Sequence, residues 1–220
     1  MSSGKRYKFN GSTFGVQTAF GSPKTITGTT AANPIVVSST AHGFVLGSVV
    51  VLDNFDAPTQ LDGAILPVDN PVTDSFELPI DGSDYEAFNA GSPNATATPI
   101  TFSTFCELTG ANQQDGGADQ YDASTICSDA KEFEQGLSDS GTLQLDFNWA
   151  GNQAVQTAIR NAKLSGDKLA FKITFPGDGG FVVMVGTVQQ TSFSGSVSDG
   201  IWRASATIKL SGEVYVLEAA

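Results

Sequence analysis

Short apolar runs separated by clusters of Gly, Pro, Asn and Asp recur along almost the whole chain. In the clearest run, Leu143, Leu145, Phe147 and Trp149 alternate with polar residues. A period of two buries one face of an extended segment and leaves the other in water, which is the pattern of a β-strand. Because such runs are rich in Val, Ile, Phe and Thr and the chain holds 24 Gly, the sequence predicts an all-β fold, mainly β with one α-helix.

The one segment with helical periodicity lies at 153–164. Its apolar residues recur three and four positions apart and form a narrow stripe that can lie on a sheet. The stripe consists of Val155, Ala158, Ile159 and Ala162. Asn152 is the expected N-cap of this helix, and Gly166 is its expected stop.

Strands are expected on both sides of the helix. Asn10-Gly11 lies between the first two runs and predicts a hairpin, and the runs after the helix predict a β-meander. The expected strands cover 6–9, 13–19, 100–108, 142–149, 168–175, 181–193, 202–210 and 214–217. A short helical turn that ends at Gly136 is expected within 130–137.

The pattern of the sequence changes at Gly21-Ser22-Pro23, and the new pattern continues to about Pro99. Short apolar runs alternate there with turn clusters, and the runs lie at 35–37, 49–52, 65–68 and 76–80. A length of 220 residues allows one large domain or two smaller ones. We expect residues 1–22 and 100–220 to form one discontinuous domain and residues 23–99 to form an inserted β module.

Residues 109–128 are polar, contain glycine and are almost without apolar periodicity. A loop of this length in a compact domain is usually functional or mobile. The candidate residues in it are Asp115, Gly116, Gly117, Asp119, Tyr121 and Asp122. Repulsion of phosphate and contact with a neighbouring subunit both fit these acids better than general acid catalysis.

The net charge is −12, and the acids are unevenly distributed. Residues 23–99 hold nine acids against Lys24, and residues 101–139 hold eight against Lys131. Residues 140–220 balance at six acids and six bases. Phosphate binding depends on clusters of Lys and Arg, so this composition argues against a protein that grips nucleic acid, although DNA can still slide past it.

The two cysteines, Cys106 and Cys127, allow at most one disulfide, and the sequence leaves open a bridge or two half-buried thiols. Their spacing is not that of a zinc site. The first residues carry no hydrophobic signal segment, and no apolar run approaches the ~20 residues of a membrane span. Secretion and membrane insertion are therefore not expected.

Residues for catalysis are few. The single histidine, His42, lies where a turn is expected, and no nucleophile elbow accompanies it. Residues 81–86 alternate oxygen ligands but depart from the helix-flanked calcium loop, so a solvated turn is the better interpretation. The glycines at 177–180 lie between two strands and predict a hairpin turn rather than a phosphate cradle. We expect no catalytic residue, no cofactor, no metal and no enzyme activity.

Three stretches after residue 105 carry a resemblance to a known family. They read CELTGANQQDGG, STICSDAKEFEQGLSDSGTLQLDFNW and KLAFKITFPGDGGFVVMVGTVQQTSFSGSVSDGIWRASATIKLSGEV. Most telling are Ala130-Lys131-Glu132-Phe133 with 136–141 and the strand that follows, and the strands around 192–195 and 204–212. In this order of segments the chain resembles siphophage tail tube (major tail) proteins, over 1–22 and 100–220.

The resemblance implies a tail-tube-type antiparallel β-sandwich or barrel and a structural subunit of the virion. It implies stacked rings, usually hexameric, whose joined sheets surround a lumen for genome ejection, with the 109–128 segment reaching the next ring. The implied partners are copies of the chain itself, tape measure and terminator proteins, and passing DNA that is not bound specifically, so the lumen is expected not to be basic. Assembly in the host bacterial cytoplasm, which is reducing, disfavours a disulfide.

Residues 24–99 are similar to small β-barrel modules that are inserted in many phage virion proteins. The similarity lies in ITGTTAANPIVVSSTAHGF, in Gln60-Leu61-Asp62-Gly63 and in 74–78. The usual Leu-Asn-Gly is Leu-Asp-Gly here, which keeps the turn chemistry. The resemblance implies a decoration on the tube exterior. The alternative is a module that attaches to host-surface glycans while the rest of the chain displays it.

Overall fold

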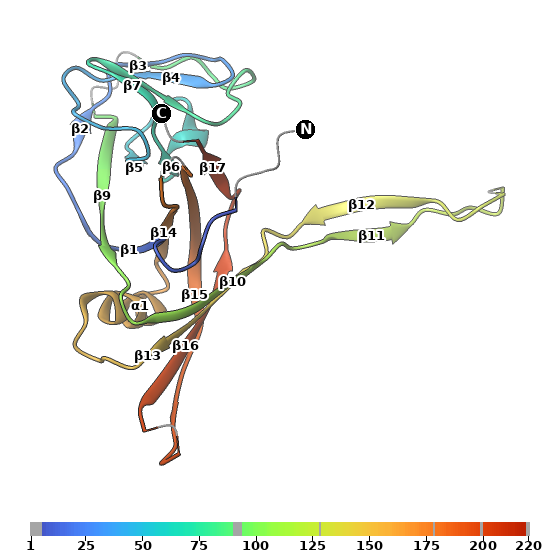
Figure 1. Ribbon diagram of the computed structural model, residues 1–220. Coiled ribbons are helices and arrows are strands. Elements are labelled where there is room, and N and C mark those ends of the chain that lie inside the picture. The colour runs from blue at the N-terminus through green and yellow to red at the C-terminus, as the bar shows by residue number, and fades with distance from the viewer. Residues whose placement is uncertain (1–5, 90–93, 128, 178, 199, 219–220) are drawn as a thin grey trace.

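The computed structural model describes residues 6–89, 94–127, 129–177, 179–198 and 200–218 (Figure 1). About half of these residues lie in antiparallel strands, and one α-helix, α1, accompanies them. The expected all-β fold with one helix is confirmed.

A long sheet runs through the molecule in the order β10-β13-β16-β15-β14-β1-β9-β5-β6, with β17 attached to β15 and β2 to β9. Its strands after the module are β10 (Leu108–Gln114), β13 (Thr142–Asn148), β14 (Lys168–Thr174), β15 (Phe181–Gly195), β16 (Trp202–Leu210) and β17 (Tyr215–Leu217). Strand β1 (Thr13–Phe20) precedes the module, and β9 (Thr96–Thr104) leads out of it. The meander after the helix and the alternation in β13 are confirmed.

Strand β15 belongs to two parts of this sheet. Its residues 181–187 pair with β14, and its residues 186–195 pair with β16. Gly186 stands where the pairing changes, and a Cβ there would lie 2.5 Å from the carbonyl oxygen of Lys209. The largest core cluster combines buried residues of both parts with the apolar stripe of α1, so the two parts and the helix share one interior.

Helix α1 (Ala154–Ser165) packs against β15, β1, β14 and β9. It ends as predicted at Gly166, whose φ of +79° is the left-handed conformation that glycine adopts without strain. The predicted N-cap at Asn152 is wrong, because the helix begins one residue later, with Gln153 in the cap position and no side-chain cap. The buried Gln156 instead ties the helix to the segment before it: its Nε2 donates to Asn148 O at 2.8 Å, and its Oε1 accepts from the Ala150 N–H at 3.0 Å.

Two further strand expectations are wrong. Residues 6–9 form no strand that pairs with β1, because both edges of β1 are already occupied, by β14 and by β9. The chain does turn at Asn10 and Gly11, the latter with a φ of +106°. A single strand at 100–108 is also wrong, since β9 ends at Thr104 and the next strand begins at Leu108.

The module at the top of Figure 1 contains a four-stranded sheet in the order β3-β4-β8-β7 and three strands that extend the long sheet. Its elements are β2 (Lys24–Thr25), β3 (Gly28–Thr29), β4 (Ile35–Ser38), β5 (Val49–Asp53), the 3-10 helix η1 (Thr59–Leu61), β6 (Ile65–Pro67), β7 (Asp69–Val72) and β8 (Ser75–Leu78). Each of the four apolar runs expected there overlaps a strand, and a core cluster fills the module.

Strand β9 crosses the expected boundary between the module and the rest. Residues 96–99 pair with β5, and residues 100–104 pair with β1. A small core cluster also includes Val49 from the module and Ile100, Phe181 and Leu217 from outside it. The division into two domains stays a prediction.

His42 is a structural residue of the module. Its side chain is 2% exposed and lies against the rings of Phe44 and Phe76. Because Nδ1 accepts from the Phe44 N–H at 3.0 Å, the proton of a neutral ring is on Nε2, which donates to Val72 O at 2.7 Å and Ser75 O at 3.1 Å.

Candidate assembly surfaces

One face of the long sheet is polar where β10, β13, β16 and residues 189–195 of β15 lie side by side. Side chains that stand opposite one another on paired strands share a face. The register therefore aligns one row of Asn112, Gln144, Thr207 and Gln190, and a second row of Gly110, Asp146, Ser205 and Ser192. Because Leu143, Leu145 and Phe147 of β13 point into the core, both rows lie on the opposite, outer face.

Few charges stand on this polar face. Asp146 and Arg203 lie on it within one surface hollow, which Ser192, Ser194 and Ser205 also line. Lys209 stands on the same face, and its charge is paired with Asp139. The face is therefore made largely of amide and hydroxyl groups, with opposite charges that nearly balance.

The polar face ends at two strand edges without a partner among the named strands of the described residues. Strand β10 pairs with β13 alone, and residues 189–195 of β15 pair with β16 alone, because the pairing of β15 with β14 stops at Thr187. Free N–H and C=O groups along an edge are a template for another strand. The two edges belong to the same four-stranded region and lie at its opposite sides.

A two-stranded ribbon projects from this sheet, at the right of Figure 1. It consists of β11 (Ala118–Asp122) and β12 (Phe133–Ser138) with the turn that joins them, and residues 115–139 are here called the arm. The predicted loop at 109–128 is wrong, since most of β10 and all of β11 lie in it. The predicted helical turn at 130–137 is wrong too, because residues 133–138 pair with β11 as a strand.

The candidate residues of the predicted loop all lie on the arm. Asp115, Gly116 and Gly117 connect β10 to β11 at its base, and Asp119, Tyr121 and Asp122 are exposed on β11. The carboxylate of Asp122 accepts from the Ser124 N–H at 2.9 Å, and hydrogen bonds from Ser124 lower its pKa. The structure thus keeps these residues together on one protrusion but gives them no shared pocket.

Asp139 fixes the base of the arm to the sheet. Its carboxylate pairs with the ammonium of Lys209 on β16 and accepts from the Gly141 N–H at 2.9 Å. The Lys209 hydrogen bond, and after it the Gly141 hydrogen bond, hold the pKa of Asp139 below its usual range. Gly141 has a φ of +87°, and a Cβ there would lie 2.1 Å from Gln114 O, so the junction is tightly packed backbone.

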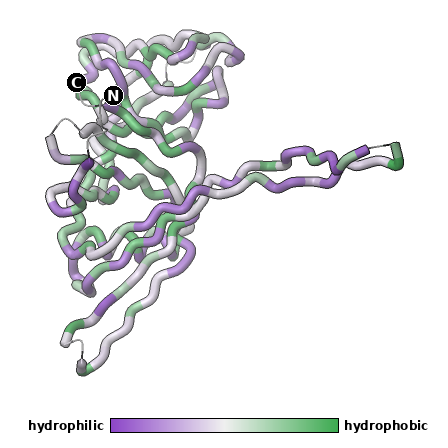
Figure 2. Tube along the Cα trace, turned by 45° about the vertical axis from the view of Figure 1, so that its right-hand side comes forward, coloured by the Kyte–Doolittle hydropathy of each residue, from purple (hydrophilic) through white to green (hydrophobic). Residues whose placement is uncertain are grey.

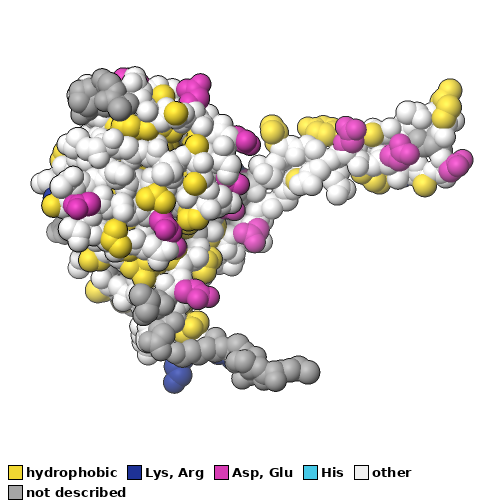
Figure 3. All heavy atoms as spheres, turned by 90° about the horizontal axis from the view of Figure 1, so that it is seen from above, with side chains coloured by type: hydrophobic (Ala, Val, Ile, Leu, Met, Phe, Trp, Pro, Cys, Tyr) yellow, Lys and Arg dark blue, Asp and Glu magenta, His cyan; other side chains and the backbone are white. Residues whose placement is uncertain are grey.

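The arm exposes apolar and acidic side chains together. Its exposed large hydrophobic residues are Tyr121, Ile126, Phe133 and Leu137. The hydropathy trace in Figure 2 becomes hydrophobic at the far end, and Figure 3 shows hydrophobic and acidic side chains next to one another along the arm. A two-stranded ribbon without a core is marginally stable in water, so this surface is suited to being covered.

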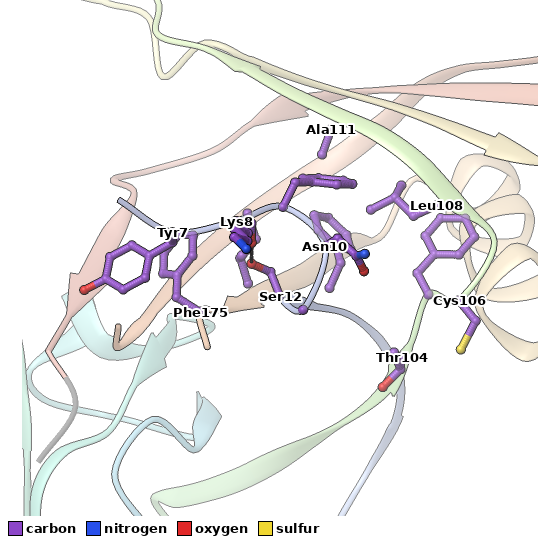
Figure 4. A pocket seen from close by; sticks show the side chains of 14 residues that line it. Tyr7, Lys8, Asn10, Ser12, Thr104, Cys106, Leu108, Ala111 and Phe175 are labelled. Carbon is purple, nitrogen blue, oxygen red and sulfur yellow. Dashed lines mark hydrogen bonds between the residues drawn. The ribbon is translucent and has the colours of Figure 1, made fainter. Parts of the chain in front are cut away.

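An apolar pocket of about 560 Å³ lies between the N-terminal segment and the start of β10 (Figure 4). It is lined mainly by hydrophobic residues, which include Phe9, Phe14, Phe105, Leu108, Ile173 and Phe175. Tyr7 stacks on Phe175 with 5.3 Å between ring centroids and closes one side. Lys8 is the charged residue among the lining residues, and Cys106 stands at the rim.

An exposed aromatic group lies where the β15–β16 hairpin leaves the body. Trp149 stacks on Phe193 at 5.3 Å, Phe193 contacts Trp202 at 5.8 Å, and the guanidinium of Arg160 lies 5.4 Å from the Trp149 ring centre. The sequence did not reveal this group, because its members come from three separate segments. The available signal was Phe193, the one aromatic residue in the otherwise polar end of β15.

Both cysteines are free and exposed, so the expectation of half-buried thiols is wrong. Cys106 stands at the pocket and Cys127 at the far end of the arm. Within the described residues, no three His, Cys, Asp or Glu side chains gather in a way that would hold a metal ion. The same residues contain no helix of the length and hydrophobicity that a membrane crossing requires.

Two open sheet edges and a projecting arm with exposed hydrophobic side chains are features typical of a subunit of a larger assembly. Residues 88–216 match the family model described as "Lambda phage tail tube protein, TTP". The chain therefore belongs to the lambda phage tail tube protein family, a family of structural proteins of the phage tail.

Among solved structures, the chain is similar to one described as "Tail of empty GTA particle computed with helical refinement, C6 symmetry". The two are 17% identical, the match covers 53% of this chain and 86% of the other, and the TM-score is 0.41. The comparison with curated proteins gives no match.

Proposed function

We propose that copies of this protein close into rings by pairing the free edge of β10 with the free edge of β15 residues 189–195, and that the rings stack into a tube. The genome passes through the bore of this tube during ejection into the host. The observation that carries the proposal is that one polar sheet region has two open edges at its opposite sides.

Strand direction favours this contact. Each neighbouring pair among β10, β13, β16 and β15 is antiparallel, so β10 runs opposite to β15. When β10 of one copy lies beside β15 of the next, the junction is antiparallel as well, and the sheet continues without a change of pattern. Such a head-to-tail contact gives a closed ring when the rotation per copy divides a full turn. Family resemblance suggests six copies.

In such a ring the polar face lines the bore. DNA carries one charge per ~1.7 Å of axis, so a wall rich in Lys and Arg would hold it by many salt-sensitive contacts. Amides, hydroxyls and balanced charges offer no such grip. The polar rows through Gln144 and Asp146 therefore support a conduit without specific DNA binding, and without catalysis.

The module lies outside the ring in this arrangement, as a decoration, because a folded unit of its size would block the bore. Tape measure and terminator proteins would meet the tube in its bore and at its end. Assembly takes place in the host cytoplasm, where the exposed thiols stay reduced. Glycan binding is not favoured, since the described aromatic residues of the module pack inward: Phe44, Phe55 and Phe76 are buried, and Tyr85 and Phe88 are half-buried.

A charge placed on the polar face tests the proposal. Gln144→Lys adds a cation at the centre of β13, and Thr73→Lys adds one at an exposed position in the turn between β7 and β8 as the matched control. Electron microscopy of purified protein should show hollow tubes for the natural protein and both variants. Phage carrying Gln144→Lys should eject DNA more slowly and with a steeper salt dependence, because each phosphate that the new lysine neutralises adds about 0.9 to the logarithmic slope.

The opposite results refute it. Protein that stays monomeric at high concentration would rule out ring closure. Slower ejection with Thr73→Lys and unchanged ejection with Gln144→Lys would show that the polar face does not line the bore.

A further inference from the structure

The arm and the apolar pocket are complementary, but they cannot meet within one copy. Leu108 lines the pocket and Ile126 stands at the far end of the arm, and the chain between them is mostly extended. At about 3.3 Å per residue, up to roughly 60 Å of chain separate the two. Figure 1 shows the arm leading away from the body without folding back. Any contact between them therefore joins two copies.

The charges of the two surfaces are opposite. The arm holds seven acids against Lys131, a net charge of −6. The pocket carries Lys8 in its wall, and Arg6 is exposed two residues away on the same segment. An acidic arm is drawn to a cationic rim, and like charge keeps the arms of neighbouring copies apart.

The apolar surfaces also correspond. Ile126 is fully exposed at the end of the arm, and Phe133 and Tyr121 are exposed on its strands. The pocket offers phenylalanine, leucine and isoleucine side chains around a space of about 560 Å³, which is larger than one such side chain needs. Seating an apolar residue there removes hydrophobic surface of both copies from water, which favours the contact.

We propose that the end of the arm, around Ile126, docks in the apolar pocket of a copy in the adjacent ring and so joins stacked rings. This inference rests on the proposed tube and names the receiving site of its inter-ring contact. The segment Tyr7–Ser12 forms one wall of this receptor, and an isolated bridge joins Asn10 to Ser12 within it. Ring closure uses strand edges, and ring stacking uses the arm and the pocket.

The two cysteines report on this contact directly. Cys127 follows Ile126 at the end of the arm, and Cys106 stands at the pocket. When the arm of one copy occupies the pocket of another, Cys127 of the first copy lies near Cys106 of the second. Because every copy contributes one of each, a reagent that bridges them links copies into a continuous series.

The experiment treats assembled tubes of the full chain with a bis-maleimide of short flexible spacer, which forms one thioether with each thiol. A denaturing gel should show dimers, trimers and higher multimers, and peptide mapping should identify the Cys106–Cys127 link. Cys106→Ser and Cys127→Ser should each abolish the series. Tubes that give no product, dimers that persist in Cys106→Ser, or a link elsewhere would overturn the proposal.

A second variant separates this contact from the tube itself. Ile126→Asp places a charge at the end of the arm, whereas Val72→Asp places one at an exposed valine of the module as the matched control. Ile126→Asp should leave closed rings but raise the protein concentration needed for stacking at least tenfold, while Val72→Asp stacks normally. Normal stacking with Ile126→Asp would refute the docking site. If the natural protein itself forms no rings, the proposed tube is refuted instead.

Discussion

Removing the module at the β1–β9 hairpin should leave a folded protein that still assembles. Phe20 at the end of β1 stands opposite Ile100 on β9, and the Gly21 N–H donates to Pro99 O at 2.7 Å. The chain therefore enters and leaves the module at adjacent points. Replacing residues 22–99 with Asn-Gly-Thr joins the strands by a two-residue turn, and the Thr restores the amide donor that Pro99 lacks.

The cost can be worked out from the contacts that the module makes with the remaining sheet. Phe181 and Ile100 are each 8% exposed and share a core cluster with Val49 of the module. Partial exposure of these two side chains costs roughly 2–4 kcal/mol, given about 1.5–3 kcal/mol for full burial of each. A domain stable by about 5–15 kcal/mol withstands that loss.

Lys172 supplies an independent readout of the same contact. Its ammonium donates to Gly47 O at 2.6 Å and lies 4.6 Å from the centre of the Phe181 ring. Burial lowers the pKa of Lys172 from its ordinary 10.5. The deletion opens this site to water, so the pKa of Lys172 should move back up toward that value, as measured by NMR of its side chain.

Urea unfolding followed by tryptophan fluorescence measures the cost, since both tryptophans, Trp149 and Trp202, lie outside the module. We expect a lower midpoint, and tubes of smaller outer diameter by electron microscopy. Phe181→Thr in the deletion variant should recover solubility if exposed apolar surface causes aggregation. A variant that stays unfolded even with this repair would show that the module belongs to the folding core. A folded variant without tubes would place ring contacts in the module.

Three further predictions concern single positions. His42→Leu removes the ring's hydrogen bonds to the backbone of Phe44, Val72 and Ser75 and should destabilise the module by about 2–4 kcal/mol in urea unfolding, with tube formation unchanged. The ion pair of Asp139 with Lys209 stabilises the arm base fully above pH 3.8, and this stabilisation is lost as the pH falls through the lowered pKa of Asp139. Lys209→Met should raise the pKa of Asp139 toward 3.8 in an NMR titration. An unchanged titration midpoint would contradict the pairing. Gly141→Ala should displace the arm and reduce stacking, whereas Gly117→Ala, with open space around its Cβ, should not; equal effects would show that the junction is not tight.

The sequence predicted the strands that bury one face and missed those that bury neither. In β13 the alternation of Leu143, Leu145 and Phe147 reports directly on a core. Strand β12 has both faces in water. Because neither face is buried, its sequence shows no alternation of apolar and polar residues. Its Phe133 and Leu137 instead stand four residues apart, which imitates one turn of a helix.

The candidate assembly surfaces were harder to predict from the sequence, because they depend on which strand pairs with which edge in the folded sheet. The polar end of β15 is open only because β14 pairs no further than Thr187, and that register is a long-range outcome. The pocket likewise joins residues 7–12, 104–111 and 173–175. The sequence did single out Asp115 to Asp122 by their polarity and glycine content, which do not need the fold to be seen, and their role stays a prediction.

Strand β15 combines a buried half with a polar, open half, which bears on how a free edge avoids indiscriminate pairing. Its first half, buried between β14, β17 and α1, is FVVMVGTV, and its second half is polar. The change coincides with a register shift between Val188 and Gln190. A bulge and polar side chains are the devices by which exposed edges avoid indiscriminate pairing. The edge therefore has little apolar surface of its own to drive association. In the proposed tube, a partner has to offer a matching antiparallel edge together with the arm contact, which favours ordered growth over aggregation.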